Sequence, residues 1–198
     1  MAGRKQFDVD EALEQAMRVF WQRGYADTSL DALGAATRLG RGSLYGTFGG
    51  KDALFRRCLD RYSATYADAY ESALAGNAGD PVRAVEAFFD VALARIADPA
   101  VPLGCLIAQS AMQTPVLEEE SGAHVRAKVA AQRGRVRGAL EGAPAAPEVL
   151  DSLAAYVVAV NQGIALMSRA GTPVAELRTV ARLARTTVAD TLGRSTAE

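Results

Sequence analysis

Residues 38–51 read RLGRGSLYGTFGGK and hold five glycines in fourteen positions, between two flanks with strongly helical patterns. The stretch predicts a turn and then a third, very short helix, which the glycine pair at 49–50 ends. Two helices joined by a three- or four-residue turn, the second short and polar on its outer face, form a helix-turn-helix. The sequence therefore predicts a module that presents a short helix to a DNA duplex.

The glycines within this short helix suit an element that must lie close to DNA. The major groove is about 12 Å wide, so bulky outward side chains would hold the helix backbone away from the bases. Gly42 and Gly46 remove that obstacle, whereas Leu44 and Phe48, at i and i+4, are expected to face inward. The residues expected at the DNA are Thr28, Ser29, Arg41, Gly42, Ser43, Tyr45, Thr47 and Lys51.

The rest of the chain repeats the 3.6-residue helical period, and the period-two alternation of β-strands is absent. The spacing of Asp8 and Glu11 resembles a capping box at the start of the first helix, and Thr28 and Asp31 repeat it before the second. Later helices are expected from Lys51, after Pro81, near residues 103, 116 and 147, and after Pro173. We predict an all-α chain of about nine helices.

Composition places the 198-residue chain among soluble globular proteins, with 49% hydrophobic and 23% charged residues. No apolar run approaches the roughly 18–20 residues of a membrane span, so we expect a cytoplasmic protein without a membrane partner. Cys58 and Cys105, with the single histidine His124, form neither a disulfide framework nor a zinc pattern. We expect no metal and no cofactor.

Charge is distributed unevenly along the chain, although the net charge is only −1. Residues 1–62 carry ten Lys/Arg against eight Asp/Glu, and the remainder carries twelve against fifteen. The sign of this asymmetry favours the N-terminal end as the place where a polyanion binds.

The N-terminal third resembles the DNA-binding domain of the TetR family of bacterial transcriptional repressors. The stretch TSLDALGAATRLGRGSLYGTFGGKDALF, after the amphipathic ALEQAMRVFWQRGY, carries the resemblance over about residues 8–62. The matching positions are Thr28, Arg41, Gly42, Ser43, Leu44, Tyr45, Phe48, Lys51 and Asp52. The resemblance implies a dimer that binds a pseudo-palindromic double-stranded operator and leaves it when a small molecule binds among helices four to eight.

Four positions depart from the family pattern. Arg38 stands where the turn glycine is usual, so a residue with a Cβ must adopt that backbone conformation or the turn differs. Gly40 replaces the usual capping serine and Gly49 the usual proline, while Gly46-Thr47 replaces an aromatic pair. We expect a recognition helix that is loose before DNA binds, with Arg38 as an additional phosphate contact.

The same resemblance implies a division into two parts. Residues 1–50, with the start of the fourth helix to about residue 62, are expected to bind DNA, and residues 51–198 to bind an effector and dimerise. Apolar walls with few polar groups indicate a mainly hydrophobic effector. The residues expected to line its pocket are Tyr62, Tyr66, Phe88, Phe89, Leu106, Gln109, Met112, Gln113 and Asn161. For the tyrosines and phenylalanines of this set, a position in the core is the competing interpretation.

Cys105 offers an alternative way to control DNA binding. Some TetR-type regulators have a similar Gly-Cys-Leu segment, and in certain of them a thiol senses oxidants or electrophiles. The nearest basic residue upstream is Arg95, ten positions away, and the neighbouring sequence has no Lys or His to activate the thiol. An inert, buried thiol is the competing interpretation.

The last two helices carry more apolar surface than one core face requires, and a second subunit is the simplest cover. We predict a symmetric dimer built on residues 147–193. Asn161 and Gln162 fit either the pocket or the interface. The residues expected at the interface are Tyr156, Val160, Gln162, Ile164, Leu177, Val180, Ala184 and Val188.

A hypothesis from another class is an all-helical enzyme or small-molecule carrier that retains a vestigial DNA-binding module. Acid/base pairs, a Ser/His/Asp set and a phosphate-binding loop are absent from the sequence, and it holds one histidine. We therefore expect no enzymatic activity.

Overall fold

The computed structural model describes residues 8–195, and this part of the chain contains nine α-helices and no strand. The all-α prediction is confirmed. A single 3₁₀ turn, Thr114–Val116, follows the sixth helix. The helices are α1 (Val9–Arg23), α2 (Leu30–Thr37), α3 (Arg41–Phe48), α4 (Lys51–Ala75), α5 (Pro81–Ala97), α6 (Leu106–Met112), α7 (Glu119–Ala139), α8 (Pro147–Arg169) and α9 (Val174–Ser195).

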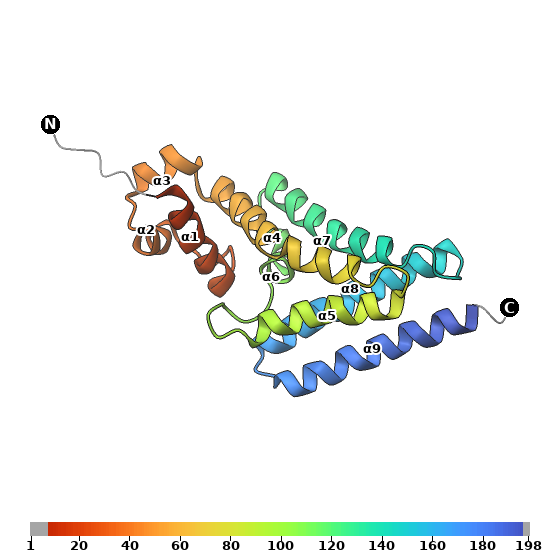
Figure 1. Ribbon diagram of the computed structural model, residues 1–198. Coiled ribbons are helices and arrows are strands. Elements are labelled where there is room, and N and C mark those ends of the chain that lie inside the picture. Colours follow the sequence, from red (N-terminus) through yellow and green to blue (C-terminus); the bar gives the residue numbers. More distant parts are fainter. Residues whose placement is uncertain (1–7, 196–198) are drawn as a thin grey trace.

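The helices form two groups that α4 joins (Figure 1). Helices α1, α2 and α3 pack together at one end of the molecule, and α4 runs from them into a bundle with α5, α7, α8 and α9. The short α6 lies where the two groups meet and contacts α1, α4, α7 and α8. A change at α6 can therefore reach both groups.

Two apolar clusters form the core. The first, around Phe20, Trp21 and Phe55, joins the N-terminal helices to the start of α4 and to α6. The second, around Phe88 and Phe89, lies between α5, α8 and α9. Burial of large aromatic side chains contributes about 1.5–3 kcal/mol each, so both clusters are substantial sources of stability.

The starts of the first two helices show how far the capping patterns predict local structure. The carboxylate of Asp8 accepts hydrogen bonds from the backbone N–H groups of Asp10 and Glu11, at 2.8 and 3.2 Å, as the spacing predicted. The second helix is capped by Ser29, whose hydroxyl accepts from the N–H of Ala32 at 3.1 Å. The expectation that Thr28 caps it is wrong.

Helix α8 contains an apolar run longer than the sequence had led us to expect. Its most apolar window has a mean hydropathy of 1.5, so by length and composition alone it is able to span a membrane. This corrects the statement that no such run exists. In the structure 44% of that window is buried within the chain.

Candidate nucleic-acid interface and the pocket behind it

The turn between α2 and α3 contains a strained residue. Arg38 has φ 59° and ψ 26°, and within residues 8–195 it is the one non-glycine residue with positive φ. An L-residue in this conformation costs roughly 1 kcal/mol, because its Cβ crowds the backbone. Of the two alternatives that the sequence left open, a left-handed Arg38 or a different turn, the structure has the left-handed Arg38, and its side chain is exposed.

Two buried side chains fix the orientation of α3. Leu44 and Phe48 are 2% and 4% exposed and face the core, as predicted. On the opposite face, a Cβ added at Gly42 or Gly46 meets no atom within 4 Å. The outer surface of α3 is therefore low and open around these two glycines, with the ring of Tyr45, 55% exposed, beside them.

The two ends of α3 are supported unequally, and the C-terminal end has a glycine cap whose N–H donates to the carbonyl of Tyr45 at 2.9 Å. Gly40 at its start provides no side-chain cap, as expected for glycine. At its other end, the guanidinium of Arg57 lies 4.9 Å from the centroid of the Phe48 ring and donates to the carbonyl of Thr47 at 3.3 Å. A cation at the C-terminal end of a helix interacts favourably with the helix dipole. No pattern in the sequence indicated this role of Arg57.

Arg41 has a partner in the free protein. Its guanidinium donates to both carboxylate oxygens of Asp31, with N–O distances of 2.8–3.1 Å. Both side chains are exposed, at 67% and 75%, and an exposed ion pair contributes at most about 1 kcal/mol. The pair therefore orients Arg41 at the start of α3, and breaking it costs little free energy.

Tyr25 organises the start of α4. The Lys51 ammonium lies 4.1 Å from the centroid of the Tyr25 ring, and the Tyr25 hydroxyl donates to Asp52 at 2.7 Å. Burial raises the pKa of Tyr25, and its hydrogen bond to Asp52 adds to the increase. Burial also lowers the pKa of Lys51, although Asp52 and Asp27 act in the opposite direction. Sequence reasoning found Lys51 but missed the tyrosine that positions it.

The predicted DNA-contacting residues are not all available. Arg38, Arg41, Ser43 and Tyr45 are exposed, as is Ser29, and Thr47 and Lys51 are half-buried. Thr28 is fully buried, and its hydroxyl donates to the carbonyl of Gly24. A direct phosphate contact through its side chain is therefore a wrong prediction, because this hydroxyl closes the turn between α1 and α2.

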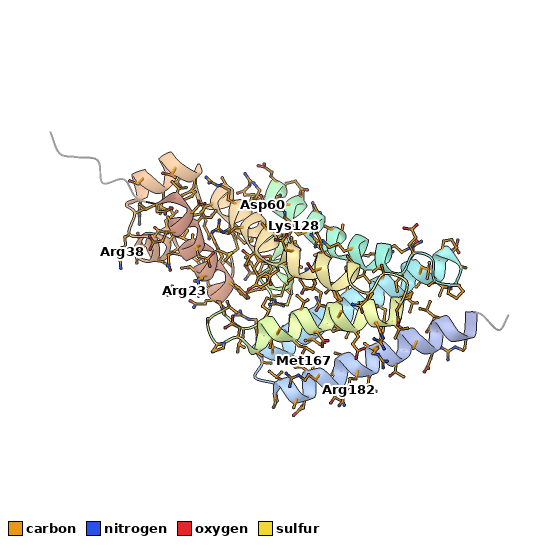
Figure 2. All side chains as sticks on the ribbon, in the orientation of Figure 1. Arg23, Arg38, Asp60, Lys128, Met167 and Arg182 are labelled. Atoms are coloured by element: carbon orange, nitrogen blue, oxygen red, sulfur yellow. The ribbon has the colours of Figure 1, made fainter. Side chains whose placement is uncertain are left out.

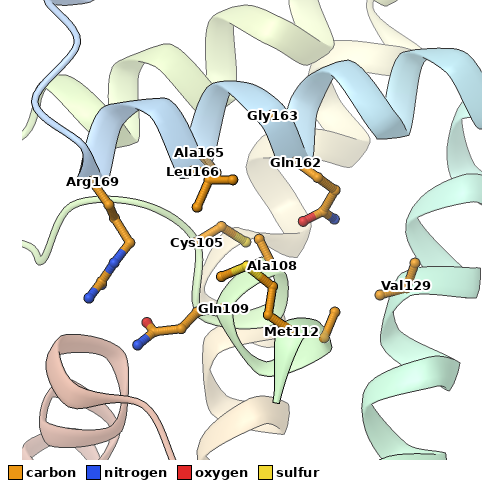
Figure 3. A pocket seen from close by; sticks show the side chains of 11 residues that line it. Cys105, Ala108, Gln109, Met112, Val129, Gln162, Gly163, Ala165, Leu166 and Arg169 are labelled. Atoms are coloured by element: carbon orange, nitrogen blue, oxygen red, sulfur yellow. The ribbon is translucent and has the colours of Figure 1, made fainter. Parts of the chain in front are cut away.

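A cavity of about 350 Å³ lies behind this module, between α6, α7 and α8. Figure 3 shows Gln162, Leu166 and Arg169 of α8 facing Gln109 and Met112 of α6. Most of its other walls are small and apolar. They include Ala108, Ala111, Val129, Gly163 and Ala165, together with Cys105 before the start of α6.

The structure corrects much of the predicted pocket lining. Gln109 and Met112 line the cavity. Asn161 of α8 is buried and does not line it, whereas its neighbour Gln162 does. Gln113 instead accepts a hydrogen bond from the backbone N–H of Tyr25 at 2.6 Å.

The predicted aromatic lining belongs mainly to the core. Tyr62 packs edge-on against Trp21 at 4.9 Å between ring centroids, and Tyr66 packs beside it. Phe88 and Leu106 are 2% and 1% exposed, so they are core residues too. Phe89 is equally buried and borders a separate groove between α5 and α9. Helical periodicity showed that these residues face inward, but it did not show which of them border a cavity.

Comparisons with known proteins identify the family. The model described as "Bacterial regulatory proteins, tetR family" matches residues 12–58, and the model "Tetracyclin repressor-like, C-terminal domain" matches residues 81–184, which is more than half of the chain. The chain belongs to the TetR family of bacterial regulatory proteins. It is a DNA-binding transcriptional regulator.

Relatives and solved structures agree with this assignment. The HTH-type transcriptional repressor ComR of Escherichia coli (strain K12) is 28% identical over 182 residues, which is 89% of this chain and 87% of ComR. A cysteine mutant of the TetR family regulator CifR, in complex with 26-bp operator DNA, superposes with a TM-score of 0.82 at 28% identity, over 92% of this chain and 97% of that one. A TetR regulator from Chloroflexus aurantiacus superposes with a TM-score of 0.79 at 25% identity, over 91% and 93%.

In this TetR-family chain, the predicted dimer face is only partly available. Ile164, Leu177, Ala184 and Val188 are at most 1% exposed and pack in the chain's own core, so they cannot contact a second subunit. Tyr156, Val160, Gln162 and Val180 are half-buried. The large apolar side chains that α8 and α9 do expose are Leu166, Met167 and Leu183, at 49%, 39% and 64%.

Proposed function

We propose that this TetR-family chain is a homodimeric repressor that binds a pseudo-palindromic operator through α3 of each copy. The carrying observation is the open outer surface of α3, where Gly42 and Gly46 leave space and Arg41 and Tyr45 are exposed. The CifR mutant bound to operator DNA and the repressor ComR support the assignment by likeness. We also propose the division into a DNA-binding part, residues 1–50, and an effector-binding and dimerisation part, residues 51–198.

We further propose that a small, mainly apolar molecule in the α6–α8 cavity releases the operator. Two contacts connect the cavity to the DNA-binding module. Arg169, in its wall, donates to the last carbonyls of α1, those of Trp21 and Gln22, at 2.8 and 2.9 Å. Gln113, at the end of α6, binds the N–H of Tyr25, and Tyr25 holds the start of α4. A ligand that displaces α6 or Arg169 therefore acts directly on the helices that position α3.

A thiol switch at Cys105 remains a second candidate for control. Cys105 borders the cavity, and the carbonyl of the preceding residue, Gly104, accepts a hydrogen bond from Arg95. Arg95 is 5% exposed, and among the described residues it has no carboxylate partner. The fold thus brings Arg95, which lies ten positions away in the sequence, to the residue before Cys105. The CifR structures are those of cysteine mutants. A Cys105→Ser variant that loses its response to oxidants but keeps operator binding would support this candidate.

Because the named relatives are regulators, we do not retain the enzyme or carrier hypothesis. We expect the protein to act in the cytoplasm, where its operator lies.

Operator binding tests the proposed function directly. Pull-down of genomic fragments identifies the operator, and fluorescence anisotropy then measures the affinity of each variant. Arg41→Ala combined with Tyr45→Phe is expected to weaken binding at least about tenfold, because it removes a base or phosphate donor and a hydroxyl. Arg182→Ala, at an exposed position of α9, is the matched loss of an arginine and is expected to change affinity by less than about twofold. Equal operator affinities of the unchanged protein and the two variants, or binding of one chain instead of two to each operator, would overturn the proposal.

A further inference from the structure

Arg41, the first residue of α3, occupies an unfavourable place for a cation. The N–H groups at the start of a helix carry partial positive charge, and Gly40 gives this end no side-chain cap. Asp31 lies in the first turn of α2, where a carboxylate is favourable, and its two oxygens accept hydrogen bonds from Arg41. A carboxylate on the preceding helix therefore holds the arginine at the start of α3.

This ion pair occupies one edge of the guanidinium and leaves another edge open. The Nε of Arg41 lies 3.1 Å from Oδ1 of Asp31, and Nη2 lies 2.8 and 3.0 Å from Oδ1 and Oδ2. Nη1 donates to no group of residues 8–195, and 67% of the Arg41 side chain is exposed. Because a guanidinium has five N–H donors in a planar fork, the edge that Nη1 and Nη2 form can still donate to two acceptors outside the chain.

A guanine base fits this open edge better than a phosphate does. In the major groove guanine presents O6 and N7, two coplanar acceptors that an arginine contacts with two hydrogen bonds. Because Asp31 neutralises Arg41, the pair carries no net charge and gains little from a phosphate, which the carboxylate repels. The first residues of a recognition helix are also those that reach base edges in helix-turn-helix proteins.

Orientation by Asp31 also lowers the entropic cost of the contact. A free arginine side chain loses rotamer freedom when it binds a base, and this loss weakens binding. The ion pair already restricts Arg41 in the free protein, and the neighbouring Gly42 adds no side chain that would hold the helix away from the groove. A guanidinium that is oriented before binding favours the one base whose acceptors match its open edge.

We propose that Asp31 is a positioning residue for base recognition. It orients Arg41 so that Nη1 and Nη2 donate to O6 and N7 of one guanine in each half of the operator. This inference rests on the proposed function and specifies which base the start of α3 recognises.

Selection of binding sites by the full-length protein from duplex DNA of random sequence tests the inference. The sites that the unchanged protein selects should contain one guanine per half-site that Arg41→Ala does not select. At this position we expect a preference for guanine over each other base of at least about fivefold. Asp31→Asn should reduce the preference to within about twofold, because Arg41 then adopts several orientations, while the other positions of the site keep their preferences. Full guanine preference in a folded Asp31→Asn variant would overturn the inference.

A matched variant separates orientation from charge. Asp27→Asn removes another exposed carboxylate of the DNA-binding part, one that forms no ion pair among the described residues. Both variants should bind unrelated DNA more tightly, because each removes a negative charge. Only Asp31→Asn should relax the guanine preference, and an equal relaxation in Asp27→Asn would contradict the positioning role.

A modified operator distinguishes a base contact from a phosphate contact. Replacing the selected guanine by 7-deazaguanine exchanges its N7 for a C–H group and leaves every phosphate in place. The unchanged protein should lose affinity by at least about threefold, whereas Arg41→Ala should bind both duplexes equally. Equal affinity of the unchanged protein for both duplexes would overturn the inference and indicate that Arg41 binds a phosphate.

The inference and the proposed function can fail separately. Selected sites that two copies bind, with a guanine preference that does not depend on Asp31, would contradict the role of Asp31 and leave the proposed function standing. Failure to select any sequence would contradict both.

Discussion

Arg38 illustrates what a single position contributes to this DNA-binding module. Its place in the turn, where the family pattern has glycine, left open a left-handed backbone or a different turn, and its φ of 59° is the left-handed one. Sequence reasoning was less successful with Thr28 and Ser29, because adjacent hydroxyl residues before a helix have the same chemistry. In the structure Ser29 caps the helix and Thr28 is buried. This choice depends on the residue at which the chain leaves α1, and no local sequence pattern determines that residue.

Replacing Arg38 by glycine is expected to change stability and DNA binding in opposite directions. Arg38→Gly relieves the left-handed strain and should raise the free energy of unfolding by up to about 1 kcal/mol. If Arg38 contacts a phosphate as proposed, the change also removes that cation, so operator affinity should fall and the salt dependence of binding should decrease by about one ion. Urea unfolding and anisotropy titrations at several salt concentrations measure the two effects. Arg38→Lys keeps the charge and should retain the salt dependence; unchanged DNA binding of Arg38→Gly would exclude a phosphate contact.

At the scale of elements, α4 connects the two groups of helices, and a polar cluster holds its middle to α7. The ammonium of Lys128 forms an ion pair with Asp60, and the Nε2 of His124 lies 2.8 Å from the same carboxylate oxygen. Figure 2 shows Asp60 and Lys128 together between the two helices. The apolar stripe of α4 was predictable from its period. This cluster was not, because it joins residues more than sixty positions apart.

The cluster predicts how stability depends on pH. Burial alone would raise the pKa of Asp60, but hydrogen bonds and charges from Lys128 and His124 outweigh it and lower the pKa below the ordinary 3.8. Its stabilisation is therefore complete above that ordinary value and is lost as the pH falls through the lower folded-state value. Asp60→Asn should cost about 0.5 kcal/mol at pH 7, since solvent screens this half-exposed pair, and progressively less below pH 4.

Urea unfolding at pH 7 and at pH 3 checks this expectation. Asp68→Asn is the control, because Asp68 is an exposed carboxylate on the same helix with no ion pair among the described residues. A cost for Asp60→Asn that is equal at both pH values would show that the cluster contributes no pH-dependent stability.

At the scale of the whole molecule, the sequence predicted the all-α fold and the DNA-binding end, but not how the C-terminal helices divide their apolar faces. Helix α9 packs along α5 and α8, and this contact buries Leu177, Ala184 and Val188. Periodicity reveals that a helix has apolar faces, but it does not reveal which face its own chain covers. The cavity was equally inaccessible to such reasoning, because small residues on three separate helices create it. The faces that remain exposed around Leu166 and Leu183 are where we expect the second copy.

The proposed mode of operator binding requires above all that the outer surface of α3 lies flush against DNA. Operator affinity of Gly46→Leu, compared with Gly134→Leu on α7, tests it most directly, because both are exposed helical glycines where an added Cβ meets no atom within 4 Å. Both variants should fold, since leucine favours a helix by about 0.5–1 kcal/mol over glycine. We predict that Gly46→Leu binds the operator at least about tenfold more weakly, while Gly134→Leu stays within about twofold of the unchanged protein. Full operator affinity in a folded Gly46→Leu variant would contradict the account.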